Sequence, residues 1–459
     1  MDINPSQSIS YFKTQYTHYI KEFRNFLKIP SVSTDPDHVK DIQEAANFLI
    51  KKLNSLGCEH VKAYKTQRHP IVYGDWLKAG SEAPTLLVYG HYDVQPPDPL
   101  EEWETRPFEP AIRGDYLFAR GASDMKGQVM AALFAIESVL HTSELHLNVK
   151  FILEGEEEIG SPSLDEFMEK HKDLLAADFV LNPDAGMIAP DVPSIVYSLR
   201  GLAYFELRVD GPKHDLHSGL FGGIVENPAH VISKIIADLH DADRHVTLPG
   251  FYDRVRPLSE EDRKKIASLK ISDAFYIKAT GVPKLWGEKG FTTLERAGAR
   301  PTLDVNGLYS GFIREGGKTI IPAYAKAKIS CRLVPDQDPD EVHKQLRLYL
   351  ETHMPDTVTW NVTMLSGAPA YLCESAPGLD RFVDALEAAW GKPVAYKREG
   401  GSIPVATSMK EILGVDSILT GFGLPDDHIH SPNERLHLPT WKRGIKALIL
   451  FILSFNNHN

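Results

Sequence analysis

Apolar side chains recur every three or four positions between residues 10 and 57. The segments ISYFKTQYTHYIKEFRNFL and DIQEAANFLIKKLNSLG both have this spacing, and the second ends at Gly57. Such spacing places apolar side chains on one face of a helix, and glycine is common just after the last helical residue. The pattern therefore predicts helices over residues 10–57.

Short apolar runs and helical patterns alternate further along the chain. The runs PTLLVYG, LNVKFILEG and ADFVLNPD contain β-branched residues and are typical of strands, whereas GQVMAALFAIESVL has a helical pattern. Alternating strands and helices are typical of α/β folds. We therefore predict an α/β domain with a mixed, largely parallel sheet and helices on both faces.

The pattern changes near residue 198. The segments YSLRGLAYFELRVDG, AYAKAKISCRLVP and TVTWNVTML alternate apolar and polar positions, as strands with one exposed face do. Two helical patterns, PAHVISKIIADLH and PDEVHKQLRLYLETH, and a long polar stretch lie among them. This combination predicts a compact α+β unit of strands backed by two helices.

Buried-core patterns such as GLDRFVDALEAAW and SILTGFG return from about residue 374. The simplest topology is one α/β domain interrupted by an inserted second domain. We predict that residues 1–198 and 369–459 form the first domain and that residues 199–368 form the insertion. Two domains agree with the length of 459 residues, which is more than one hydrophobic core usually supports.

Composition and charge narrow the class of protein. Hydrophobic residues make up 42% of the chain and charged residues 24%, as in an ordinary soluble globular protein. The formal net charge of −12 argues against nucleic acid or an anionic membrane as the main partner. The N-terminal segment lacks the basic and apolar regions of a secretory signal, and the most apolar run, ALILFIL, is too short to span a bilayer.

The cysteines Cys58, Cys331 and Cys373 are odd in number and widely spaced. They indicate neither a disulfide framework nor a CxxC metal site. We therefore expect a cytoplasmic protein in which any metal is held by His, Asp and Glu side chains.

Polar clusters follow the predicted strands. Three strands run into His91 and Asp93, into Glu156–Glu158 and into Asp184, and a fourth runs into LPDDHIHSPNE, which contains His428 and His430; a further cluster, RGASDMKGQ, supplies Asp124 just before a helix. In open α/β sheets the ligand crevice lies at the carboxyl ends of the strands. We therefore expect these side chains to meet at one edge of the sheet.

Several clustered acids repel one another unless cations lie among them. A run such as EGEEEIGS usually lies on a solvated surface, but a pair of divalent metals would also remove the repulsion. Two metals need a bridging carboxylate, with a carboxylate and a histidine on each side. That demand is met by His91, Asp124, Glu158, Asp184 and His430. Glu157 is left over as a proton shuttle for hydrolysis.

Four motifs, GHYDVQP, RGASDMKG, EGEEEIGS and HSPNE, resemble the metal-binding motifs of the M20 family of di-zinc metallopeptidases. Three more, HDLHSGLFGG, GGKTIIPAYAKAKISCRLVP and REGGSIPV, are most similar to those of its carnosinase-like dipeptidase branch. The resemblance runs from about residue 85 to residue 435, with the motifs in the same order. It implies a metal-dependent peptidase of the dipeptidase type with two divalent ions, Zn²⁺ first and Mn²⁺ or Co²⁺ as alternatives.

The resemblance also implies a role for each metal-site residue. Asp124 would bridge the two ions, with His91 and Asp184 completing one site and Glu158 and His430 the other. Glu157 would be general base and then general acid. Asp93 would hydrogen-bond the His91 imidazole, and the Asp124–Met125 peptide bond would be cis. Glu156 has no implied chemistry, and we expect it to be solvated.

If the resemblance holds, residues outside the metal site also contribute to catalysis and substrate binding. His217 would reach across a homodimer interface to hydrogen-bond the developing oxyanion, so the insertion would be a lid and dimerisation domain. Arg332 and Ser402 would hold the C-terminal carboxylate of a dipeptide, since a guanidinium pairs with a carboxylate in two hydrogen bonds. Gly401 would let the backbone approach the substrate, and Asn306 would add a contact.

Three classes of function stay open on the sequence alone. The first is a dipeptidase, and the second is an N-acyl-amino-acid hydrolase or carboxypeptidase with the same chemistry and a different acyl pocket. The third is a binding protein without activity, which would be expected to have lost a metal ligand or the base. His428 is expected to be a surface histidine, and Asp426 and Asp427 to be turn residues.

Overall fold

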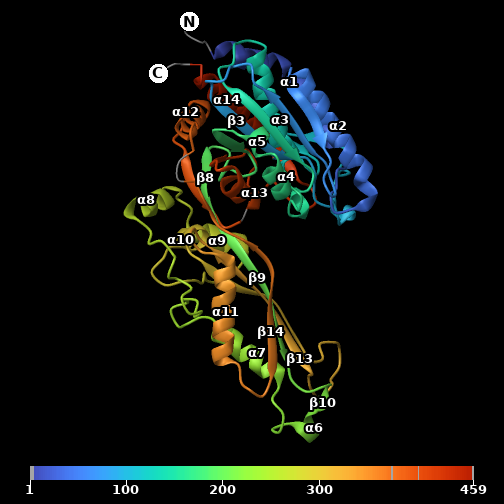
Figure 1. Cartoon of the computed structure of the whole chain (residues 1–459), viewed down its shortest axis with the longest axis vertical. Coiled ribbons are helices and arrows are strands. Elements are labelled where there is room, and N and C mark those ends of the chain that lie inside the picture. The colour runs from blue at the N-terminus through green and yellow to red at the C-terminus, as the bar shows by residue number, and fades with distance from the viewer. Residues whose placement is uncertain (1–4, 374–375, 402, 457–459) are drawn as a thin grey trace. The chain divides into compact units, whose positions relative to one another are not determined.

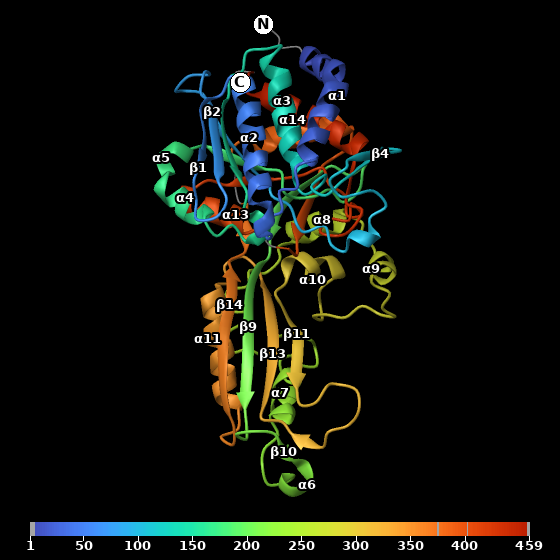
Figure 2. The same cartoon turned by 90° about the vertical axis from the view of Figure 1, so that its right-hand side faces the viewer.

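The computed structural model describes residues 5–373, 376–401 and 403–456. The chain divides into two compact units (Figures 1 and 2). Unit 1 comprises Met1–Tyr197, Cys373–Tyr396 and Val405–Asn459, and unit 2 comprises Ser198–Leu372 and Lys397–Pro404. None of the helices in the described ranges is long and apolar enough to cross a membrane.

A mixed sheet forms the centre of unit 1. Its strands, in spatial order, are β1 (Glu59–Tyr64), β2 (Ile71–Trp76), β6 (Asn148–Glu154), β3 (Thr85–His91), β7 (Phe179–Asn182), β17 (Ser417–Leu419) and β8 (Ser194–Leu199). The four strands β6, β3, β7 and β17 are parallel to their neighbours within this group, and the outer pairs are antiparallel. The end of β8 pairs with β15 (Tyr371–Leu372), and β16 (Ala395–Glu399) also pairs with β8. The predicted mixed α/β fold with a largely parallel sheet is confirmed.

Helices and a small sheet complete unit 1. The helices are α1 (Ser6–Leu27), α2 (Val39–Ser55), α3 (Lys126–Leu140), α4 (Leu164–Lys170), α5 (Lys172–Leu175), α12 (Leu379–Trp390), α13 (Pro404–Ser408) and α14 (Leu438–Ser454). The small sheet has the order β18 (Arg435–His437), β5 (Tyr116–Phe118) and β4 (Ala111–Arg113).

Helix α3 fixes the position of the loop that precedes it. Its sequence is apolar on almost every side, so it lies buried against β3, with α1 and α14 packed on it. Near its start, Gly127 leaves no room for a side chain, because an added Cβ would lie 2.1 Å from the carbonyl oxygen of Ala122. Trp441 Nε1 of α14 donates a hydrogen bond to the Gly127 carbonyl oxygen at 2.7 Å. The loop that carries Asp124 is thus held tightly against its own helix.

Unit 2 is an antiparallel sheet with two helices packed on one face. The sheet has the order β11 (Thr302–Ser310), β13 (Tyr324–Leu333), β9 (Gly201–Asp210) and β14 (Thr359–Ala368). Buried and partly exposed residues alternate along β9 and β13, and the buried ones pack on α7 (Pro228–Ala237) and α11 (Pro339–His353). Side chains such as Phe205, Ile232 and Leu346 form this core.

The long polar stretch of unit 2 contains elements that the sequence pattern did not predict. They are the helices α8 (Glu260–Ser268), α9 (Asp273–Thr280) and α10 (Thr293–Ala299) and the strand β11. Most side chains of β11 are exposed or half-buried, so its sequence lacks a regular apolar alternation. Unit 2 also contains the short β10 (Leu216–His217), β12 (Ile320–Ile321) and α6 (Ser218–Phe221).

Candidate metal centre

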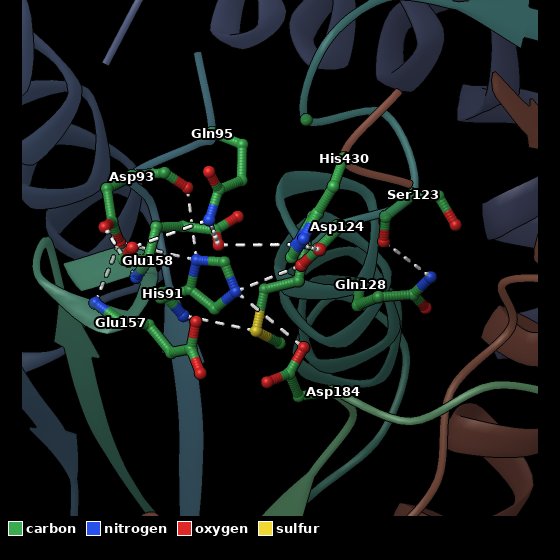
Figure 3. Close-up of polar contacts among 12 residues, drawn as sticks. His91, Asp93, Gln95, Ser123, Asp124, Gln128, Glu157, Glu158, Asp184 and His430 are labelled. Carbon is green, nitrogen blue, oxygen red and sulfur yellow. Dashed lines mark hydrogen bonds and ion pairs between the residues drawn. The ribbon is translucent and has the colours of Figure 1, made fainter. Parts of the chain in front are cut away.

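The ends of three neighbouring parallel strands deliver the polar residues of the site. Strand β3 ends at His91, strand β6 is followed by the helical turn Glu157–Ile159, and strand β7 is followed after one residue by Asp184. Asp124 lies two residues before α3, and His430 lies in the loop after β17. All of these residues belong to unit 1. The chain therefore brings five distant segments to one edge of the sheet (Figure 3).

Two groups of possible metal ligands share the carboxylate of Asp124. In the first group, His91 Nε2 lies 3.2 Å from Asp124 Oδ1 and 3.7 Å from Asp184 Oδ1. In the second group, His430 Nε2 lies 2.9 Å from Asp124 Oδ2 and 3.4 Å from Glu158 Oε2. Within each group, one ligand atom of every residue lies within 4.8 Å of the others. One carboxylate with a different histidine at each oxygen suits two neighbouring cations.

The donor set fits divalent metal ions. His91 is fully buried, and its Nε2 has no hydrogen-bond partner among the described residues although carboxylate oxygens lie beside it. A buried polar atom without a hydrogen bond is costly, and a coordinated ion would satisfy it. Imidazole and carboxylate ligands suit Zn²⁺, and Mn²⁺ accepts them too.

The other imidazole nitrogen of His91 is fixed by Asp93. His91 Nδ1 lies 3.1 Å from the carbonyl oxygen of Asp93 and 3.4 Å from its Oδ1 atom. The Asp93 carboxylate also accepts hydrogen bonds from the backbone N–H groups of Glu157 and Glu158, at 3.3 and 3.1 Å. Asp93 thus ties the end of β3 to the turn after β6.

Burial and neighbouring charges change the pKa values of these groups. Burial raises the pKa of Glu157 and that of Glu158 to about 8, and neighbouring carboxylates add to this effect. Burial would raise the pKa of Asp124 as well, but the hydrogen bond with His430 and the nearby imidazole of His91 outweigh burial and lower that pKa. The hydrogen bond with Asp124 raises the pKa of His430 to about 9. Glu157 lies beside the two ligand groups, and its raised pKa is near neutrality, which suits a general base.

The expectation that Glu156 is solvated was wrong. Its side chain is 1% exposed. Its carboxylate accepts hydrogen bonds from His69 N at 2.7 Å, Thr66 Oγ1 at 2.8 Å, and Ser163 N and Oγ, both at 3.1 Å. The three adjacent glutamates at the turn after β6 thus have three different sets of neighbours.

Two carboxylates of the His430 loop hold the Asp124 loop in place. Glu434 is fully buried and accepts the backbone N–H groups of Gly121, Ser123 and Asp124 at 2.9, 2.9 and 3.1 Å. It also accepts a hydrogen bond from Arg120 at 2.8 Å. Asp427 Oδ2 accepts the Ser123 hydroxyl at 2.9 Å and the backbone N–H of Leu424 at 2.8 Å.

The sequence reasoning gave Glu434 no role, although it ends the HSPNE motif. It also missed Gln95, whose Nε2 donates to Glu158 Oε2 at 2.7 Å. The expected features nearby agree with the structure: His428 is exposed, and the Asp124–Met125 peptide bond is cis.

The remaining predicted site residues belong to unit 2. Arg332 lies on β13 and Asn306 on β11, and both line a cavity of about 490 Å³. Gly401 is exposed, and Ser402 lies outside the described residues. His217 is also exposed, and its Nδ1 accepts the backbone N–H of Gly219 at 2.9 Å. The proton of the neutral imidazole is therefore on Nε2, which is left as a donor.

Comparisons with known proteins agree with this geometry. The model of peptidase family M20/M25/M40 matches residues 87–454. Among curated proteins, the Cys-Gly metallodipeptidase DUG1 of Candida albicans is 31% identical over 94% of this chain and 93% of its own length. The human Beta-Ala-His dipeptidase is 32% identical over 80% of this chain and 74% of its own length.

A comparison with solved structures shows that the fold is similar as well. An M20 family metallo-carboxypeptidase from Sulfolobus solfataricus is 34% identical and superposes with a TM-score of 0.84, covering 95% of this chain and 99% of that one.

Proposed function

The chain belongs to peptidase family M20/M25/M40 and is a metallopeptidase, and from that premise we propose that it hydrolyses the peptide bond of dipeptides. The observation that carries this proposal is the pair of ligand groups that share Asp124, with Glu157 beside them. The similarity to curated dipeptidases over most of the chain supports the substrate class.

The metal centre would hold two divalent ions, with Zn²⁺ first and Mn²⁺ or Co²⁺ as alternatives. We assign His91 and Asp184 to one ion, Glu158 and His430 to the other, and Asp124 to both. Two such ions, when bound, lower the pKa of a water molecule and polarise the scissile carbonyl group. Asp93 keeps the Nε2 atom of His91 free for coordination, because it occupies Nδ1.

Glu157 would move the proton during the reaction. Its carboxylate takes a proton from the attacking water as the water oxygen bonds to the carbonyl carbon. The same proton then passes from Glu157 to the amine nitrogen as the C–N bond breaks. A carboxyl group whose burial raises its pKa suits both halves of this transfer.

Substrate binding is assigned to unit 2. The guanidinium of Arg332 would pair with the C-terminal carboxylate of the dipeptide, with Ser402, Gly401 and Asn306 as further contacts. His217 would donate from Nε2 to the oxyanion, and it would do so in the active site of a partner subunit. Exposed apolar side chains near His217, such as Leu220 at 69% and Ile224 at 76% exposure, support a homodimer interface on this part of unit 2.

We also propose a cytoplasmic location. Cys58, Cys331 and Cys373 form no disulfide bonds among the described residues, and cysteines without disulfides are usual in a reducing compartment.

A second candidate function is carboxypeptidase or N-acyl-amino-acid hydrolase activity. The chemistry would be the same, but the pocket for the acyl part of the substrate would differ. The observation that favours it is the 34% identity to the Sulfolobus metallo-carboxypeptidase.

The test is a panel of dipeptides, tripeptides and N-acyl-amino acids assayed before and after chelation. We expect dipeptides to be hydrolysed fastest, activity to be lost with chelator, and Zn²⁺, Mn²⁺ or Co²⁺ to restore it. Faster cleavage of tripeptides or N-acyl-amino acids would favour the second candidate. Full dipeptide hydrolysis by protein shown to be metal-free would contradict the mechanism.

A further inference from the structure

The cavity of about 490 Å³ in unit 2 has an unusual concentration of positive charge. Among the described residues that line it, five are arginines and two carry carboxylates: Arg200, Arg244, Arg296, Arg300 and Arg332, with Glu288 and Asp304. The volume is in the usual range for small-molecule sites and is large enough for an amino-acid residue.

One of the two carboxylates is already used by one arginine. Arg300 donates to both carboxylate oxygens of Glu288, at 2.7 and 2.6 Å. Arg296 interacts with the same residue differently, because its Nε donates to the Glu288 carbonyl oxygen at 2.8 Å. That interaction leaves the positive charge of Arg296 without compensation by the Glu288 carboxylate.

The other arginines increase the excess of positive charge. Arg200 Nε donates to the carbonyl oxygen of Gly400 at 3.3 Å, which again involves no charge. Burial and, to a smaller extent, the nearby charge of Arg332 together lower the pKa of Arg200 to about 10. Arg244 is exposed and lies over the ring of Trp286, 5.5 Å from its centroid. Among the described lining residues, Asp304 is the carboxylate that remains to balance these groups.

Such a cavity favours a ligand with more than one negative charge. Arg332 and Asn306, which are assigned above to the substrate, line the same cavity as Arg200, Arg244 and Arg296. A single carboxylate is matched by the fork of one guanidinium, so the α-carboxylate of the substrate accounts for Arg332 alone. We propose that the cavity binds a C-terminal residue with an acidic side chain, so that the preferred substrates are dipeptides that end in glutamate or aspartate.

This inference rests on the proposed dipeptidase function and adds the specificity of that site. A neutral side chain would leave Arg244 and Arg296 without an anionic partner, and a basic side chain would be repelled. The preference for an acidic side chain should weaken at high salt, because salt screens the charges of exposed groups such as Arg244.

The first experiment compares two dipeptides of nearly equal shape, Ala-Glu and Ala-Gln. We expect kcat/KM to be at least about tenfold higher for Ala-Glu, mostly through a lower KM, and the ratio to fall as NaCl is added. Equal or faster hydrolysis of Ala-Gln would overturn the inference and leave the dipeptidase function intact. If the protein hydrolyses N-acyl-amino acids but neither of the two peptides, the proposed dipeptidase function is contradicted instead.

The second experiment locates the selectivity in the cavity. We expect Arg244→Gln and Arg296→Gln each to lower the Ala-Glu to Ala-Gln ratio several-fold. The matched control is Arg347→Gln on α11, an exposed arginine of the same unit that lies outside the cavity. An unchanged ratio in both cavity variants would overturn the assignment. Because Arg244 is exposed and makes no ion pair among the described residues, its variant is expected to fold normally.

A binding measurement gives the same answer without turnover. Calorimetric titration of the full chain with free glutamate and with free glutamine compares the two products directly. We expect glutamate to bind at least about tenfold more tightly, and Arg244→Gln to reduce this difference. Equal binding of the two amino acids would overturn the inference even if no peptide is cleaved.

Discussion

Glu434 accepts the backbone N–H of Asp124, with 3.1 Å between Oε1 and the nitrogen. The two residues are 310 positions apart, and each lies on a loop that contributes to the metal centre. Glu434 is fully buried, and its two oxygens also accept N–H groups from Gly121 and Ser123. The residue therefore sets the distance between the Asp124 loop and the loop that carries His430.

Replacing Glu434 by glutamine is expected to weaken metal binding. Both oxygens of Glu434 accept hydrogen bonds from N–H groups, so an amide nitrogen at either position would face a donor. We expect metal affinity to fall on the order of 10–100-fold, as for other residues that orient ligands. The measurement is titration of the chelated protein with Zn²⁺, with circular dichroism to check the fold.

The control for this variant is Glu104→Gln, an exposed glutamate of unit 1. It should bind metal like the unchanged protein. If Glu434→Gln lowers the melting temperature and leaves the metal affinity unchanged, Glu434 serves the fold alone and does not position Asp124.

Glu157→Gln is expected to abolish most of the activity and to retain the metals. Glutamine has nearly the same shape but cannot take or return a proton, and loss of a general acid–base group typically lowers the rate on the order of 10²–10⁴-fold. The measurements are kcat for dipeptide hydrolysis and metal content by elemental analysis. Glu166→Gln, an exposed glutamate on α4, is the matched control. Near-normal turnover in Glu157→Gln would remove this residue from the mechanism.

Sequence patterns predicted which polar residues of unit 1 lie together better than they predicted the elements of unit 2. The ends of the strands could be predicted because buried parallel strands are short apolar runs. Polar residues at the ends of these runs, such as His91 and Asp184, are therefore easy to identify in the sequence. Strand β11 was missed because most of its side chains are exposed or half-buried, so no alternation marks it. Helices α8 to α10 lie in the same polar stretch, and their apolar residues likewise show no clear helical spacing.

The environment of single acidic residues could not be predicted from the sequence. Glu156 and Glu434 look like surface residues in the sequence, yet both are buried and accept several backbone N–H groups. Their partners come from distant segments, such as His69 for Glu156 and Gly121 for Glu434. Only the folded chain shows that these amides need an acceptor.

The metal-free protein is expected to become less stable as the pH rises from 5 to 7. In the folded chain, burial raises the pKa of Glu154, Glu157 and Glu158 to about 8 each. In the unfolded chain these groups ionise near pH ~4.3. The folded state thus binds more protons in this window, and the free energy of unfolding falls with pH, by up to about 1.4 kcal/mol per pH unit for each group.

The measurement is the melting temperature of chelated protein at pH 5, 6 and 7. Lys126 has the opposite effect, because burial lowers its pKa to about 7, but this effect appears mainly above pH 7. Bound metal stabilises the ionised carboxylates, so the metal-loaded protein should show a smaller decrease. A melting temperature of the chelated protein that is constant or rises over this range would contradict the raised pKa values.

Mixed dimers are expected to recover activity when one subunit carries His217→Ala and the other carries Glu157→Gln. If His217 acts in the partner's active site, each homodimer lacks one essential group in both sites. A hybrid dimer has two sites, one of which has both groups intact, so purified hybrids should recover about half of the sites. The measurement is kcat of hybrid dimers purified with two different affinity tags after co-expression.

The control for this experiment pairs Glu157→Gln with His430→Ala. Both residues belong to the metal centre of unit 1, so no hybrid of these two variants contains a complete site. Recovery with His217→Ala and none with His430→Ala would establish that His217 acts in the active site of the partner subunit. A purified hybrid of the His217 and Glu157 variants with no activity would mean that His217 acts within its own subunit. In that case the exposed apolar side chains beside it would need another explanation.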